Sequence, residues 1–304
     1  MAVSCCAVLC KKALNEGCAI PVQNIDKPDD DLYNIGMNTK ITHSKALQIV
    51  NILALIAALI VNILSNALPL NGRTAAEISD ALPSYFTPAG YTFSIWGLIY
   101  TALIGFAIYQ ALPAQQNNHL LGQIGWRFGI SSVLNAAWLG AWHYGYYTLS
   151  VGIMMGLLIT LILIYTRLGI GKLNPNLSLA DKLLVQFPFS LYLGWITVAT
   201  IANTASVLNH FGWGGWGIAE PIWSVIMIGA AVIVAGMLLF NRRNLAYAGV
   251  LVWALFGIRA AYPTVAVVAN TAVIAAILIL ILALVGYWRT RTTRTVTLPH
   301  AQPA

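Results

Sequence analysis

The segment SLYLGWITVATIAN, residues 190–203, is apolar enough to lie in a membrane, yet it contains a tyrosine, a tryptophan, two threonines and an asparagine. A helix that only had to dissolve in lipid would have no need of these side chains. Tyr192, Trp195 and Ala199 follow one another at i, i+3 and i+7, and Asn203 continues the same face one turn later. The pattern predicts a helix with an aromatic and polar stripe that faces protein.

The composition places this helix in a multi-pass membrane protein. Hydrophobic residues make up 59% of the 304 residues and charged residues 8%, and the mean hydropathy is +0.76. A hydrocarbon core about 30 Å thick needs about 20 apolar helical residues. We therefore predict an all-α integral membrane protein with about eight transmembrane helices. They are expected at residues 46–67, 89–112, 125–144, 148–168, 183–208, 220–240, 245–262 and 264–288.

The basic residues predict how these helices are oriented. With a cytoplasmic N-terminus, eight spans place all but two of the 16 Lys and Arg residues in the cytoplasm and leave only Arg73 and Arg259 outside. Both termini are therefore expected in the cytoplasm, with the chain in a plasma or inner membrane. The net charge of +7 reflects this asymmetry. It does not indicate nucleic-acid binding, because no basic cluster adjoins a soluble domain.

The chain is expected to have four parts. The N-terminal part contains all four cysteines, of which Cys5 and Cys6 are open to acylation, and Met37 is an alternative start. The expected parts are a cytoplasmic, disordered tail (1–44), a bundle of five helices (45–210), three further helices (211–288) and a basic cytoplasmic tail (289–304).

Carboxylates are absent from the middle of the predicted spans. Among the nine acidic residues only Glu220 adjoins a span, at its outer end. This counts against ion-coupled transport and against carboxylate catalysis. Phosphate-binding loops, nucleophile elbows and zinc motifs are also missing. We predict no catalytic residue, no metal site and no required cofactor.

Two other predicted helices carry stripes like that of residues 190–203. They contain Phe93, Trp96 and Tyr100 in the second span, and Asn135, Trp138 and Trp142 in the third. In the predicted topology Trp96, Trp138 and Asn203 share the outer half of the membrane. The stripes fit a pocket walled by three helices, but aromatic stripes at helical spacing more often simply pack helices against one another.

The three stripes resemble the signature helices of the TspO/MBR family, the tryptophan-rich sensory proteins related to the mitochondrial translocator protein. The similar segments are FTPAGYTFSIWGLIY (86–100), LNAAWLGAWHYG (134–145) and YLGWITVATIAN (192–203). The resemblance covers residues 45–210 and implies a five-helix bundle there. This chain differs in having Leu191 where the family has a proline, and in its three additional spans.

The resemblance implies a hydrophobic ligand site among these helices, under a lid formed by residues 68–88. Family members bind tetrapyrroles such as protoporphyrin IX and heme, and animal relatives bind cholesterol. The lid residue Arg73 would pair with a propionate. His143 and His210 could ligate a tetrapyrrole metal, or simply face water at the membrane surface. The candidate ligand-binding residues are Phe93, Trp96, Tyr100, Asn135, Trp138, Trp142, Tyr192, Trp195, Ala199 and Asn203.

The function expected from these observations is that of a membrane-embedded binding protein, a sensor, carrier or scavenger, for a hydrophobic ligand such as protoporphyrin IX or heme. The alternatives are a transporter of a lipid-like or amphipathic solute, a porphyrin-degrading enzyme and a purely structural scaffold. The sequence favours a binding protein over an enzyme. The expected partners are the lipid bilayer, a tetrapyrrole or sterol-like small molecule and a possible second copy of the chain, but no nucleic acid.

Overall fold

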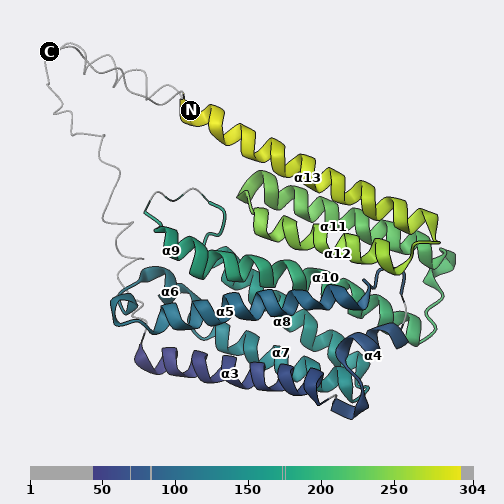
Figure 1. The fold of residues 1–304 in the computed structure, drawn as a ribbon, viewed down its shortest axis with the longest axis horizontal. Helices are drawn as coiled ribbons and strands as arrows, with labels where there is room; N and C mark the ends of the chain where they lie inside the picture. The colour runs from purple at the N-terminus through teal and green to yellow at the C-terminus, as the bar shows by residue number, and fades with distance from the viewer. Residues whose placement is uncertain (1–43, 69, 83, 173, 175, 296–304) are drawn as a thin grey trace, which may run out of the picture. The chain divides into compact units, whose positions relative to one another are not determined.

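The computed structural model describes residues 44–68, 70–82, 84–172, 174 and 176–295. This part of the chain is helical and contains no strand. All eight predicted blocks form long helices, drawn in Figure 1. These are α3 (Lys45–Ala67), α5 (Ile95–Ala111), α7 (Arg127–His143), α8 (Tyr147–Arg167), α10 (Phe187–His210), α11 (Glu220–Arg242), α12 (Leu245–Ala261) and α13 (Ala266–Thr295). The short helices are α4 (Ala75–Ala81), α6 (His119–Ile124) and α9 (Leu179–Asp181).

The predicted all-α, multi-pass membrane fold is confirmed. Within the described residues, six helices are long and apolar enough to cross a membrane by themselves. The other two, α7 and α12, have 17 residues each, which makes them about 25 Å long. Below, "the predicted outer end" means the end of the bundle that holds the lid and the C-terminus of α10.

Helix α10 is the centre of the bundle. It packs against α5, α8 and α12, while α3 lies against α7 and α5, and α11 and α13 lie beyond α12 (Figure 1). In its most apolar stretch 67% of the residues are buried, against 28–33% in the five other spanning helices. Because α10 meets protein on several sides, it can carry polar and aromatic side chains that a lipid-facing helix would not.

The start of α10 shows how the chain accommodates Pro188. A proline has no N–H to donate within a helix, and its ring crowds the preceding turn. The five residues Lys182–Gln186 form a π-helical turn directly before α10, and a local adjustment of this kind can re-satisfy the backbone groups that a proline frees. Further along α10, a Cβ at Gly194 would lie 3.1 Å from Cβ of Val250 in α12. The small residue therefore lets these two helices approach closely.

The first half of the predicted lid is the short helix α4. Thr74 caps its N-terminus by accepting a hydrogen bond from the Glu77 N–H, and the Glu77 carboxylate accepts from Thr74 in return. These bonds, first from the Thr74 backbone and then from its hydroxyl, lower the pKa of Glu77. The lid thus begins with a locally stabilised helix.

Helix α12 and Tyr262 directly after it hold the end of the lid and the turn that follows the lid, residues 89–92. The indole Nε1 of Trp253 donates to the Thr92 carbonyl at 3.0 Å, and the Tyr262 hydroxyl donates to the Ser84 carbonyl at 2.7 Å. The Ala89 N–H donates to the carbonyl of Gly257 at 3.1 Å. One of the three additional helices is therefore tied to the lid of the family-like part.

The close approach at Gly257 gives a first prediction. A Cβ at this position would overlap the Thr92 side chain and lie 2.9 Å from Cβ of Pro88. Overpacking of this kind costs about 1–3 kcal/mol, and each kcal/mol lowers the unfolding midpoint by about 2–4 °C in a protein of this size. We expect Gly257→Ala to lower the midpoint measured by tryptophan fluorescence in detergent.

Gly249 in the same helix provides the control, because a Cβ there would meet nothing within 4 Å. Gly249→Ala should unfold at or slightly above the wild-type temperature, since alanine favours a helix. Equal midpoints for the two variants would show that α12 does not clamp the lid.

The structure describes two of the four predicted parts of the chain almost completely. The helices of residues 45–210 and 211–288 pack into one compact unit. The predicted N-terminal tail, 1–44, lies outside the described residues except for Ser44, which caps α3. The first residues of the predicted basic tail, 289–304, continue α13 as a helix to Thr295.

Candidate ligand-binding site

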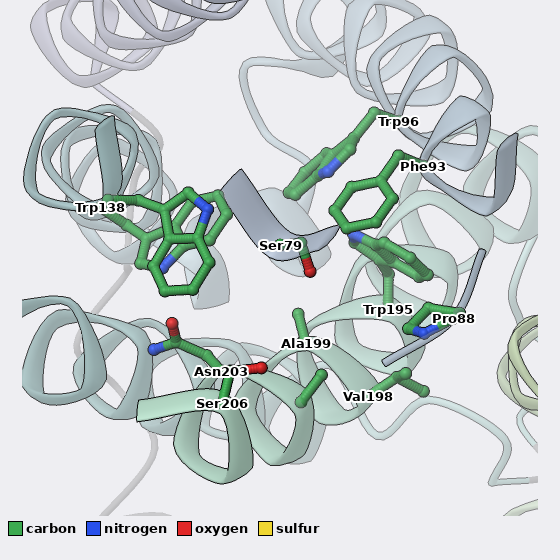
Figure 2. A pocket seen from close by; sticks show the side chains of 12 residues that line it. Ser79, Pro88, Phe93, Trp96, Trp138, Trp195, Val198, Ala199, Asn203 and Ser206 are labelled. Atoms are coloured by element: carbon green, nitrogen blue, oxygen red, sulfur yellow. The ribbon is translucent and has the colours of Figure 1, made fainter. Parts of the chain in front are cut away.

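Two groups of aromatic rings face each other near the predicted outer end. On α7, Trp138 and Trp142 are stacked with centroids 6.0 Å apart and planes 18° apart. Opposite them, Trp195 of α10 meets Phe93 and Trp96 edge to face, at 5.7 Å and 6.3 Å. Figure 2 shows the two groups separated by a gap, with Ser79 of α4 at the same level.

The gap is a cavity of about 30 Å³, which is room for one or two water molecules. Seven of the ten predicted ligand-binding residues line it. Its lining consists of Ser79, Pro88, Phe93, Trp96, Trp138, Trp142, Trp195, Val198, Ala199, Ala202, Asn203 and Ser206. The stripes of the second, third and fifth predicted spans therefore converge on one site.

Three of the four indoles of this site face protein and not lipid. The exposed fraction is 5% for Trp138, 3% for Trp142 and 2% for Trp195. A tryptophan that anchors a protein at the membrane surface would keep one edge exposed to the headgroups. These three side chains therefore belong to the interior, where they either pack the bundle or enclose a ligand.

Three hydrogen-bond donors of the cavity lining lack partners in the described part of the chain. They are the indole nitrogens of Trp138 and Trp195 and the side-chain nitrogen of Asn203. The Asn203 oxygen, in contrast, accepts a hydrogen bond from Ser150 at 3.2 Å. A buried donor without a partner costs about 1–3 kcal/mol. The cavity is thus suited to a ligand that brings hydrogen-bond acceptors.

The other three predicted residues, Tyr100, Asn135 and Tyr192, lie next to the cavity on the side away from the predicted outer end. The side-chain oxygen of Asn135 accepts hydrogen bonds from the Tyr100 hydroxyl and the Asn62 amide, both at 3.0 Å. Tyr100 stacks on Trp96 at 5.2 Å, and Tyr192 meets Trp96 edge to face at 6.0 Å. These residues do not line the cavity, but they fix the orientation of the Trp96 ring that does.

The remaining candidates lie away from the cavity lining. Arg73 has an exposed side chain and a favourable Coulomb interaction with Glu77. A charged guanidinium group has a lower free energy in water beside a carboxylate than in an apolar cavity. His143 is buried, with Nδ1 2.7 Å from the Leu139 carbonyl oxygen, and His210 packs edge to face on Tyr147.

Five lining residues were not expected from the sequence. Ala202 and Ser206 follow Ala199 at i+3 and i+7, so extending the α10 stripe by two turns would have found them. Val198 neighbours that stripe. Ser79 and Pro88 belong to the lid, and no periodic pattern in the sequence shows which lid residues turn inward.

Comparison with known proteins agrees with this architecture. The model of a family described as TSPO-like protein matches residues 48–285. The match extends beyond residues 45–210, which carry the TspO/MBR resemblance, and includes α11, α12 and most of α13. No curated protein and no solved structure gives a significant match. Since the family match covers most of the chain, this protein belongs to the TSPO-like family.

Proposed function

We propose that this membrane-embedded protein binds a flat hydrophobic ligand with acceptor groups at its edge, for which a tetrapyrrole such as protoporphyrin IX or heme is suitable. The observation that carries the proposal is the cavity between the Trp138–Trp142 pair and the Phe93–Trp195 pair (Figure 2). Indole and phenyl faces stack on a macrocycle. The unpaired donors of Trp138, Trp195 and Asn203 are available to its carboxylates.

Ligand binding requires the cavity to open. Pockets for small molecules usually measure about 300–1,000 Å³, whereas this cavity measures about 30 Å³. Binding of a macrocycle therefore requires the two aromatic groups to separate.

The lid is the element best placed to open. Ser79 and Pro88 of the lid cover the cavity. Two hydrogen bonds fix the lid to α7: the Trp142 indole donates to the Ala75 carbonyl at 3.3 Å, and the Asn71 amide donates to the His143 carbonyl at 3.0 Å. Each such bond contributes about 1 kcal/mol. Lifting α4 would break these two bonds and also expose Ile78, which is 4% exposed in the structure, at a further cost of about 1.5–3 kcal/mol. Because α4 has only seven residues, this cost is smaller than that of separating long helices that bury many such side chains.

The proposal is tested by titrating the purified full chain in nanodiscs with protoporphyrin IX. Stacking against the buried indoles should quench tryptophan fluorescence saturably, at one porphyrin per chain. Free tryptophan amide at the same absorbance, with its signal corrected for the inner-filter effect, is the control. Quenching that rises linearly without saturation would indicate partitioning into lipid and would refute the proposal.

Two further assays, one on the protein in sealed vesicles and one on the nanodisc preparation, separate binding from the two other activities that the sequence left as alternatives. A transporter would move a solute across sealed vesicles, and a porphyrin-degrading enzyme would bleach the Soret band of the bound pigment under light. For a binding protein we expect neither transport nor decay beyond that of porphyrin in empty nanodiscs.

A further inference from the structure

Helix α10 borders a second cavity, on a face that does not touch the aromatic site. This cavity measures about 560 Å³, within the usual range for small-molecule pockets. It lies between α10, α11 and the loop that joins them, with Met155 of α8 and the lid residues Ser84 and Tyr85 completing it, and its lining shares no residue with that of the aromatic cavity. We call it the α10–α11 groove. Its lining is Ser84, Tyr85, Met155, Thr200, Ile201, Thr204, Ala205, Leu208, Asn209, Trp213, Gly214, Gly215, Ile218, Ala219, Glu220, Trp223, Ser224 and Met227.

The groove has an aromatic, acidic end and an apolar end. Glu220 begins α11 at the predicted outer end, near Trp213 and Trp223 of the lining. Met227 lies seven residues further along α11, which is about 10 Å deeper. Met155 and Ile201 complete the deep end. A ligand that fits this arrangement has a polar head and an apolar chain.

The position of the aromatic end is fixed by the loop that joins α10 to α11. The Trp223 indole donates to the Gly215 carbonyl at 2.8 Å. Trp213 packs against Trp223 with centroids 5.3 Å apart. Gly215 has a φ of +61°, a conformation that favours glycine, and a Cβ there would lie 3.1 Å from the Trp223 Nε1. A hydrogen bond and an aromatic contact therefore fix the positions of Trp213 and Trp223.

The charge of the groove selects the kind of head group. Glu220 is the single charged residue of the lining, and its exposed side chain has no ion pair within the described residues. The N-terminus of α11 contributes about half a positive charge, so the full negative charge of the carboxylate prevails. Cations are attracted by this carboxylate and by the faces of nearby indoles, whereas anionic heads are repelled.

The groove is accessible from its side. Met155, Leu208 and Ile218 are 43%, 37% and 38% exposed, and all three lie in its lining. In the membrane these exposed apolar side chains would face acyl chains. A molecule dissolved in the membrane can therefore reach the groove without passing the lid.

From these observations we infer that the α10–α11 groove binds a single-chain amphiphile with an ammonium head. The head lies between Glu220 and the indoles of Trp213 and Trp223, and the alkyl chain runs past Ala205 toward Met155 and Met227. This site is separate from the proposed tetrapyrrole site and does not depend on it.

The test uses the full chain in dodecyl maltoside micelles, which contain no competing ammonium group. The probe is dodecyltrimethylammonium with a photoreactive diazirine at the end of the chain, and labelled residues are mapped by mass spectrometry. We expect saturable labelling of α8, α10 and α11 near Met155, Ile201 and Met227, reversed by unlabelled dodecyltrimethylammonium. A probe with the same chain and a sulfate head should not label these positions saturably.

Two variants test the head and the chain separately. Glu220→Gln should raise the half-saturation concentration about two- to fivefold, the usual value of a partly exposed charge pair. Ala205→Phe should abolish labelling in the groove, while Ala199→Leu, on the other face of α10, should leave it unchanged. If Ala205→Phe does not fold, as judged by gel filtration, the half-saturation concentration of Glu220→Gln is the result that tests the inference.

The inference is overturned if the sulfate probe labels the groove as well as the ammonium probe, or if Glu220→Gln has no effect. It is also overturned if label spreads without saturation over the exposed faces of α3 and α13. None of these outcomes bears on protoporphyrin binding, and loss of porphyrin binding would not affect this result.

Discussion

Ala199→Leu is expected to weaken protoporphyrin IX binding by about thirtyfold or more. Ala199 lies in the cavity lining between the two aromatic groups (Figure 2). Its small side chain leaves the space that a macrocycle would occupy, and a leucine would project into that space. Overpacking costs about 1–3 kcal/mol, and 2 kcal/mol corresponds to about thirtyfold in the dissociation constant. The measurement is the fluorescence titration in nanodiscs.

The matched control is Ala205→Leu. This alanine lies on the same helix, is similarly half-buried, and faces the α10–α11 groove. The control should bind protoporphyrin IX as the wild type does, and both variants should remain folded. If both lose affinity equally, or if neither does, the porphyrin does not bind between the aromatic groups.

Asn135→Leu is expected to destabilise the protein by about 2–4 kcal/mol. The Asn135 oxygen is the shared acceptor for the Asn62 amide and the Tyr100 hydroxyl, and Asn135 is 1% exposed. Leucine has a similar volume but leaves two buried donors with one partner fewer, at about 1–3 kcal/mol each. Part of this cost is offset because leucine also removes the side-chain nitrogen of Asn135, a buried donor without a partner in the described part of the chain. Loss of the Tyr100 contact also frees Trp96, which stacks on it. We expect a lower unfolding midpoint and weaker porphyrin binding.

Tyr100→Phe is the control for this network. It removes one donor and keeps both the ring that stacks on Trp96 and the bond between Asn62 and Asn135. Its cost should be about 1 kcal/mol or less, in line with interhelical hydrogen bonds in membranes. An Asn135→Leu protein as stable as Tyr100→Phe would show that the network contributes little.

The features predicted correctly from the sequence are those governed by simple periodicity and run length. Apolar stretches of about 20 residues must be helical in a membrane, so all eight blocks appear as helices. Helical spacing also brings Trp195, Ala199 and Asn203 to one face of α10, because neighbours at i+4 and i+8 share a face.

What could not be predicted depends on contacts between distant segments. Asn62 carries no motif of its own, and its role emerges only because α3 packs against α7. The loop before α4 places Arg73 at the surface beside Glu77, which no sequence pattern shows, and its pairing with a propionate stays a prediction. The link from α12 to the lid depends on Gly257, which looks like any other small residue of an apolar helix.

The additional helices are part of the site's support. The family match includes them. Trp253 and Gly257 of α12 bond the turn after the lid, and Tyr262, directly after α12, bonds Ser84 of the lid. Helix α11 forms one wall of the α10–α11 groove. The central helix α10 thus separates two cavities of different chemistry, one aromatic and closed, the other amphipathic and open at its side.

The most direct measurement is an experimental structure of the protein with protoporphyrin IX bound. We predict the macrocycle between the Trp138–Trp142 pair and the rings of Phe93 and Trp195, with α4 displaced and a carboxylate near the Asn203 amide. A porphyrin found on a lipid-facing surface or in the α10–α11 groove, with the aromatic cavity still closed, would contradict the account.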